Sequence, residues 1–153
     1  MYNLVSDVKP SKKLEGLLDF LVTMANDMLE NFGEFDPVGM VLIEDGNVIM
    51  LDTTFWQKDG SAKGLSGNQL LRKIEDGIRE IRSKKRLDCA IIFYDATLRS
   101  QDGSDEPMDA LLGRLEERHG VACQVIIEYK INSGHFEIAN KYFVQKEHHL
   151  IPD

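Results

Sequence analysis

Residues 38–51 read Val38-Gly39-Met40-Val41-Leu42-Ile43-Glu44-Asp45-Gly46-Asn47-Val48-Ile49-Met50-Leu51. Two apolar runs flank Asp45-Gly46, a dipeptide typical of a two-residue type I′ turn, because both central positions of that turn need positive φ. The stretch therefore predicts a β-hairpin, which we place over residues 38–55. The rest of the chain should supply what this hairpin packs against.

The predicted hairpin is apolar on both faces. Pairing outward from the turn sets Ile43 opposite Val48 and Leu42 opposite Ile49. In this register one face carries Val41, Ile43, Val48 and Met50, and the other carries Met40, Leu42, Ile49 and Leu51. A hairpin with one face in water would alternate apolar and polar residues instead. We therefore expect a separate layer of structure on each face.

Two amphipathic segments are predicted to form covering helices. The first begins at a capping Ser11 and ends near Phe32, with Gly33 in the left-handed position that follows a helix. Its apolar stripe comprises Leu14, Leu18, Leu21, Ala25, Met28 and Phe32. The second begins at a capping box, Ser66-Gly67-Asn68-Gln69, and continues to about Lys85. The first helix would cover one face of the hairpin, and the second would cross the sheet.

Further strands follow the second helix. The segment Leu87–Asp95 has an unbroken apolar middle, which predicts a strand covered on both sides or nearly so. Alternating apolar residues predict another strand over Val121–Tyr129, and Phe136–Ala139 with Tyr142–Gln145 are interpreted as a last strand. Residues 1–10 are interpreted as a leader, and residues 146–153 are expected to fray.

The segment Asp109–Arg118 is compatible with two structures. As a helix, it would be capped by Asp105, and its three leucines would share a face. As a strand, it would join Val121–Tyr129 through the loop Arg118-His119-Gly120, with Gly120 in a left-handed bulge. The strand register pairs Leu115 with Cys123, Gly113 with Val125 and Leu111 with Ile127.

Two motifs resemble a family of small bacterial single-domain proteins without an established activity. They are Phe35-x-Pro37-x-Gly39-x-x-Leu42-x-x-Asp45-Gly46 and Asp109-Ala110-x-x-x-x-Leu115-Glu116, with Phe143-x-Gln145 similar to the family's closing segment. The resemblance implies a C-terminal β-hairpin and so favours a strand over Asp109–Arg118. It implies no catalytic residues, and the chain departs from the pattern at Glu128, where the family commonly has proline.

The expected fold is a single α+β domain over residues 1–153, with an antiparallel five- or six-stranded sheet, covering helices and the order α-β-β-α-β-β-β. This order is similar to that of roadblock and profilin-like domains, whose sheets often pair with another protomer. Because fold does not determine function, the similarity is an analogy of topology.

Composition limits the classes of partner. The 18 basic and 26 acidic residues give a net charge of −8, which argues against nucleic-acid and anionic-membrane binding and permits a basic protein partner. No signal peptide is visible in Met1–Lys13, and no apolar run approaches the roughly 20 residues of a membrane-spanning helix. Cys89 and Cys123 lie in predicted strands, as buried reduced thiols do, so we expect a cytoplasmic protein.

The sequence shows no constellation of reactive groups. Cysteines among apolar strand residues are usually inert, and the four histidines lack the spacing of metal ligands. A paired-carboxylate site built from Glu116, Glu128 and Asp95 is conceivable, but exposed strand carboxylates are the default. We therefore predict no catalytic, cofactor-binding or metal-binding residues. Phe55 and Trp56 are the candidate partner surface, because aromatic residues are enriched at interfaces.

These observations favour a non-enzymatic protein-interaction or regulatory module that self-associates, with a homodimer as the expected oligomer. One alternative is an acidic antidote or binding protein for a basic partner, suggested by the net charge of −8. Another is a small-molecule-binding protein or enzyme with a pocket between the sheet and the first helix.

Overall fold

The computed structural model describes residues 8–98 and 107–152. It contains two helices, α1 (Lys12–Phe32) and α2 (Gly67–Lys84), and the strands β1 (Val38–Ile43), β2 (Val48–Leu51), β3 (Leu87–Leu98), β4 (Met108–Glu117), β5 (Ala122–Asn132) and β6 (His135–Gln145). The strands form one antiparallel sheet in the order β2-β1-β3-β4-β5-β6. The predicted α+β class is confirmed, and β6 adds one strand to the predicted order.

The helices begin and end where the sequence predicted. The Ser11 side chain accepts a hydrogen bond from the Leu14 amide at 3.2 Å, and Gly33 ends α1 at φ 76°. At α2 the capping box is complete, because Ser66 and Gln69 each accept a hydrogen bond from the other's backbone amide. In the described part of the chain, neither helix is both long and apolar enough to cross a membrane.

The β1–β2 hairpin forms, but its predicted register is wrong by one residue. Met40 lies opposite Met50 and Leu42 opposite Val48, so every β2 side chain faces the other way from the prediction. Only Gly46 has positive φ, at 94°, and its amide donates to the Ile43 carbonyl. The connection is therefore a three-residue loop with a left-handed glycine, which Asp45-Gly46 suits as well as a type I′ turn. Strand β2 also ends at Leu51, before Phe55.

The ambiguous segment is strand β4, and its predicted register with β5 is confirmed. Leu115 pairs with Cys123 and Gly113 pairs with Val125. In the connecting loop the left-handed residue is His119, at φ 59°, and not Gly120 as predicted. Gly113 is required by packing, because a Cβ atom there would lie 2.8 Å from Val125 and 2.9 Å from Phe93.

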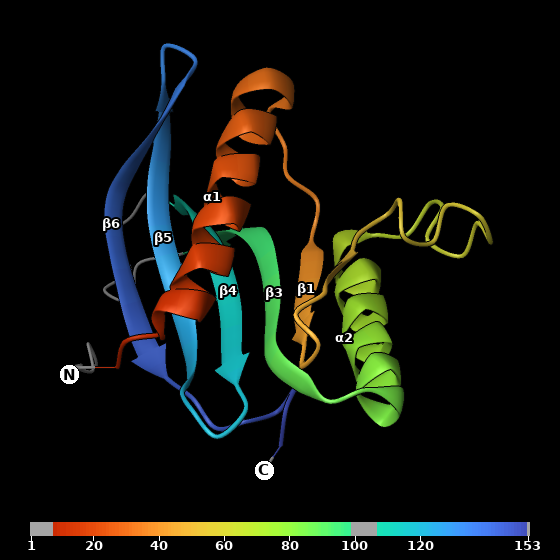
Figure 1. Ribbon diagram of the computed structural model, residues 1–153. Coiled ribbons are helices and arrows are strands. Elements are labelled where there is room, and N and C mark those ends of the chain that lie inside the picture. The colour runs from red at the N-terminus through yellow and green to blue at the C-terminus, as the bar shows by residue number, and fades with distance from the viewer. Residues whose placement is uncertain (1–7, 99–106, 153) are drawn as a thin grey trace.

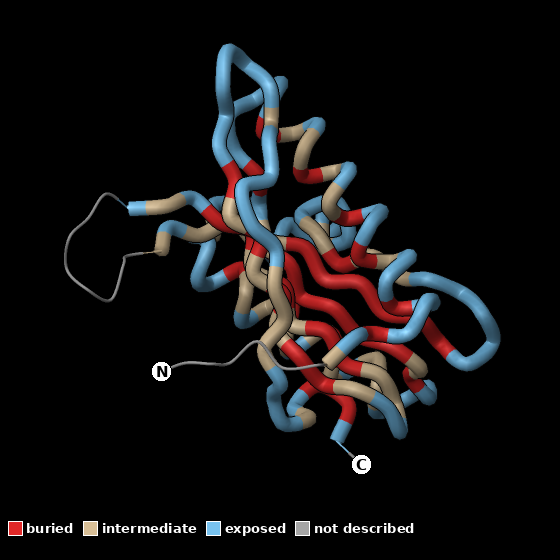
Figure 2. Tube along the Cα trace, turned by 90° about the vertical axis from the view of Figure 1, so that its left-hand side faces the viewer, coloured by how far each residue is buried: buried red, intermediate tan, exposed pale blue. Residues whose placement is uncertain are grey.

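Each face of the sheet carries its own core (Figure 1). Helix α1 lies across one face and buries Leu14, Leu18, Leu21, Ala25 and Leu29. Helix α2 covers the other face over β1 and β3 with Leu70, Ile74 and Ile78. Strand β1 is thus buried on both sides, as the pattern predicted, whereas in the edge strand β2 only Leu51 is buried and Val48 is exposed. Figure 2 shows the buried residues in the middle of the sheet, whereas the tip of the β5–β6 hairpin is exposed.

The two helices cover different shares of the sheet. Helix α1 lies over its middle, whereas α2 lies toward the β1 end and leaves the same side of β4, β5 and β6 without a covering helix in the described structure (Figure 1). This partly uncovered area is where the candidate site lies.

Candidate functional site

A row of four half-buried residues runs from Tyr94, at the edge of the core beneath α2, across the uncovered strands β4, β5 and β6. Strand register places Tyr94 beside Leu112, Leu112 beside Ile126, and Ile126 beside Tyr142. All four are neither fully buried nor exposed, and together they form what we call the tyrosine row. A half-exposed apolar row ending in tyrosines has the composition of a protein interface, where large aromatic side chains are enriched.

Opposite charges lie on the two sides of the tyrosine row. On β4, Arg114 follows Leu112 by two residues and lies nearer to the end of the strand at Glu117. Glu128 lies two residues beyond Ile126 in the opposite direction, and the Tyr142 hydroxyl donates to its carboxylate at 3.4 Å. The row therefore has an arginine, which is paired with Glu116, on one side and a glutamate on the other.

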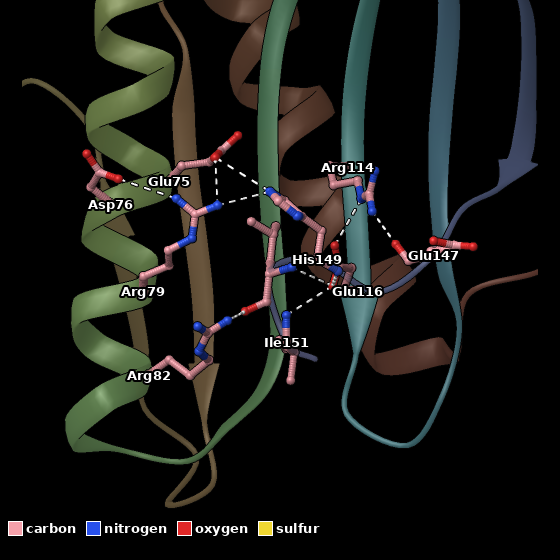
Figure 3. A network of polar contacts seen from close by, with 10 residues as sticks. Glu75, Asp76, Arg79, Arg82, Arg114, Glu116, Glu147, His149 and Ile151 are labelled. Carbon is pink, nitrogen blue, oxygen red and sulfur yellow. Dashed lines mark hydrogen bonds and ion pairs between the residues drawn. The ribbon is translucent and has the colours of Figure 1, made fainter. Parts of the chain in front are cut away.

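Glu116 is the one charged residue that is fully buried among the described residues, at 0 % exposure. Its Oε1 atom accepts hydrogen bonds from the backbone amides of His149, Leu150 and Ile151 at 2.8, 2.8 and 3.0 Å (Figure 3). Its Oε2 atom accepts one from Arg114 Nε at 2.9 Å. Burying a carboxylate is costly unless its oxygens are hydrogen-bonded, and both oxygens of Glu116 are.

The Glu116 hydrogen bonds hold the segment 146–151, which we call the tail, against the sheet. Leu150 and Ile151 are 1 % and 4 % exposed and join the core beneath α2. From α2, Arg82 donates to the Leu150 carbonyl at 2.7 Å. The expectation that the chain frays after Lys146 is therefore wrong for these residues. The tail instead extends the covering layer from α2 toward β4.

Further contacts hold Glu147 and His149 of the tail. The guanidinium of Arg114 also donates to the Glu147 carbonyl. Arg79 contacts Nε2 of His149 at 3.0 Å and Glu75 at 3.1 Å, so α2, the tail and β4 are joined by one polar network (Figure 3). Sequence reasoning missed this network because its central carboxylate binds backbone amides, which leave no residue pattern.

A cavity of about 250 Å³ lies beside this network. It is lined by Leu71 and Glu75 of α2, by Ile92, Tyr94, Arg114 and Gln124 of the sheet, and by Lys146, His149 and Leu150 of the tail. A second cavity, of about 420 Å³, lies beside Trp56 in the 53–64 loop. The predicted pocket between the sheet and the first helix is absent at the α1 residues that face the sheet, because Leu14, Leu18, Leu21 and Ala25 are fully buried there.

The predicted aromatic pair lies away from the tyrosine row, in the loop after β2. Phe55 is 47 % exposed, and its ring meets that of Trp56 edge to face at 5.0 Å. Lys73 of α2 lies over the Trp56 ring at 4.9 Å, which fixes the indole on that helix. A partner surface at Phe55 and Trp56 stays a prediction.

The carboxylates of the hypothetical acid–base site are not brought together. Glu128 pairs with Ala110, six residues along β4 from Glu116. Asp95 faces α1, on the other side of the sheet, where it accepts a hydrogen bond from Tyr129 at 2.7 Å. Burial raises the pKa of Asp95, and burial with this hydrogen bond raises the pKa of Tyr129.

Cys89 and Cys123 are free and buried, and burial raises the pKa of each thiol to about 11. They lie on β3 and β5, with β4 between them. Two strand spacings, about 9–10 Å, exceed the ~7 Å limit for a disulfide. Residues 8–98 and 107–152 contain no group of three or more His, Cys, Asp or Glu that could hold a metal ion.

The chain matches no protein-family model, no curated protein and no solved structure. The resemblance to small bacterial proteins therefore stays a prediction from the two sequence motifs.

Proposed function

We propose that this protein is a non-enzymatic interaction module that self-associates through the tyrosine row. The observation that carries the proposal is the half-buried row Tyr94, Leu112, Ile126 and Tyr142, whose members on β4, β5 and β6 have no covering helix in the described structure. Apolar side chains on such a surface gain from being covered, at about 25 cal/mol per Å² removed from water.

The charges beside the row favour a second copy as the partner. An isologous dimer has a two-fold axis, and here that axis would lie along the row between two stacked sheets. The rotation brings the Arg114 side of one copy over the Glu128 side of the other, while the apolar rows face each other. Residues of opposite charge therefore face each other across the proposed interface.

Light scattering during size-exclusion chromatography at low micromolar concentration tests the proposal. The wild type should have about twice the 17.4 kDa mass of the chain. Leu112→Glu or Ile126→Glu should return the mass to that of a monomer, because each places a charge in the centre of the interface.

Phe20→Glu is the matched control, because Phe20 is an apolar residue 55 % exposed on the outer face of α1. It should leave the dimer intact. A monomeric wild type would contradict self-association, and a dimer broken by Phe20→Glu alone would place the interface on α1 instead.

A further inference from the structure

We infer that the 250 Å³ cavity between α2, the sheet and the tail binds a small organic anion with an apolar part. This site is separate from the self-association surface in function, although Tyr94 belongs to both. Its ligand would lie beside the tyrosine row and contact the tail.

Three polar side chains in the cavity wall lack a partner. Within the described chain, the Tyr94 hydroxyl, the Gln124 amide and the Lys146 ammonium group make no hydrogen bond or ion pair. They come from β3, β5 and the tail, so the fold brings them together from positions far apart in sequence. Polar groups that converge on one cavity and have unused hydrogen-bonding capacity are typical of a ligand site.

The balance of these groups favours an anion. All three can donate hydrogen bonds, and Lys146 is cationic, whereas the nearby Arg114 is already paired with the buried Glu116 at 2.9 Å. The one carboxylate in the wall, that of Glu75, is already paired with Arg79 at 3.1 Å.

Apart from His149, which contacts Arg79, the remainder of the wall is apolar, and the cavity is small. Leu71, Ile92 and Leu150 supply side chains without polar atoms. The volume of about 250 Å³ is below the ~300–1,000 Å³ typical of ligand pockets. A compact ligand with one acidic group and a hydrocarbon portion fits the volume of the cavity. Its acidic group would meet the polar side chains of the wall, and its hydrocarbon portion would meet the apolar ones.

Benzoate is a suitable probe, with benzamide as its uncharged analogue. We expect benzoate, titrated into the full chain at neutral pH and followed by ¹H–¹⁵N NMR, to shift the side-chain amide of Gln124 and the backbone amides of residues 146–150. Benzamide should bind at least about tenfold more weakly, because it lacks the charge that Lys146 attracts. Inorganic phosphate, which has the charge but no apolar part, should also bind more weakly.

Lys146→Gln should weaken benzoate binding at least about tenfold, whereas Lys130→Gln, at an exposed lysine on β5 outside the cavity, should not. Lys146 is exposed, so its variant is expected to keep the wild-type spectrum elsewhere. Equal binding of benzoate and benzamide, shifts confined to other residues, or no shift would overturn the inference. The oligomeric mass of the same samples is a separate measurement, so failure of this site and failure of self-association are distinguishable.

Discussion

Replacing the buried carboxylate of Glu116 should release the tail while the sheet stays folded. Ordering the six residues 146–151 costs roughly 6–12 kcal/mol, at about 1–2 kcal/mol per residue. Burying Leu150 and Ile151 contributes only about 3–6 kcal/mol. Docking therefore depends on the three hydrogen bonds from tail amides to Glu116, each of which is charge-assisted and contributes about 1.5–3 kcal/mol.

Glu116→Gln keeps the shape of the side chain and removes its charge. We expect tail docking to weaken by about 3–4.5 kcal/mol, because each of the three amide hydrogen bonds to Oε1 falls from about 1.5–3 to about 0.5–1.5 kcal/mol when the acceptor is neutral. At about 1.4 kcal/mol per factor of ten, the tail should open at least about 100-fold more often. Native-state hydrogen exchange measures this opening directly at the amides of His149, Leu150 and Ile151.

The matched control is Glu117→Gln, which alters the neighbouring carboxylate. The Glu117 carboxylate accepts a hydrogen bond from the Ser11 amide at 3.0 Å, and among the described residues it makes no hydrogen bond with the tail. This variant should leave the three tail amides protected. If those amides stay protected in Glu116→Gln as well, the carboxylate does not hold the tail and the energetic reasoning is refuted.

Three further predictions concern packing, thiol reactivity and pH. Gly39→Ala should destabilise the protein by about 1–3 kcal/mol in urea unfolding, because a Cβ atom there would collide with α2. Gly16→Ala should instead stabilise the protein by about 0.5–1 kcal/mol, because Gly16 has open space around it. Cys89 and Cys123 should not react with a thiol reagent at pH 8 until the protein is unfolded, and rapid native labelling would contradict their burial. Burial raises the pKa of Asp95 above 3.8, so the folded state favours the protonated form of this side chain. As pH rises from below 3.8 through the raised pKa, the wild type should therefore lose thermal stability relative to Asp95→Asn. Melting temperatures of the two proteins that change in parallel across that range would refute this.

Local signals in the sequence predicted much of the fold. Ser11 and Ser66 cap their helices as expected, because capping depends on residues within one turn. The register of β4 and β5 followed from matching two alternating apolar patterns through Leu115 and Cys123. The β1–β2 register failed because that hairpin is apolar on both faces, so its pattern does not distinguish one register from the next.

The candidate site was less accessible to sequence reasoning. The tyrosine row joins four strands whose register had to be known before Tyr94 and Tyr142 could be placed on one line. The sequence predicts that Glu116 is an exposed strand residue. It is buried because the tail docks against it. Both features depend on contacts between segments far apart in the chain, which periodicity does not report.

Dilution of the isotope-labelled protein from millimolar to low micromolar concentration, followed by ¹H–¹⁵N NMR, tests self-association through the tyrosine row most directly. The account predicts concentration-dependent shifts at Tyr94, Leu112, Ile126 and Tyr142, and constant shifts at Phe20 on α1. Two results would contradict self-association through the tyrosine row. One is NMR relaxation rates that are those of a monomer at every concentration. The other is chemical shifts that change on α1 and not along the row.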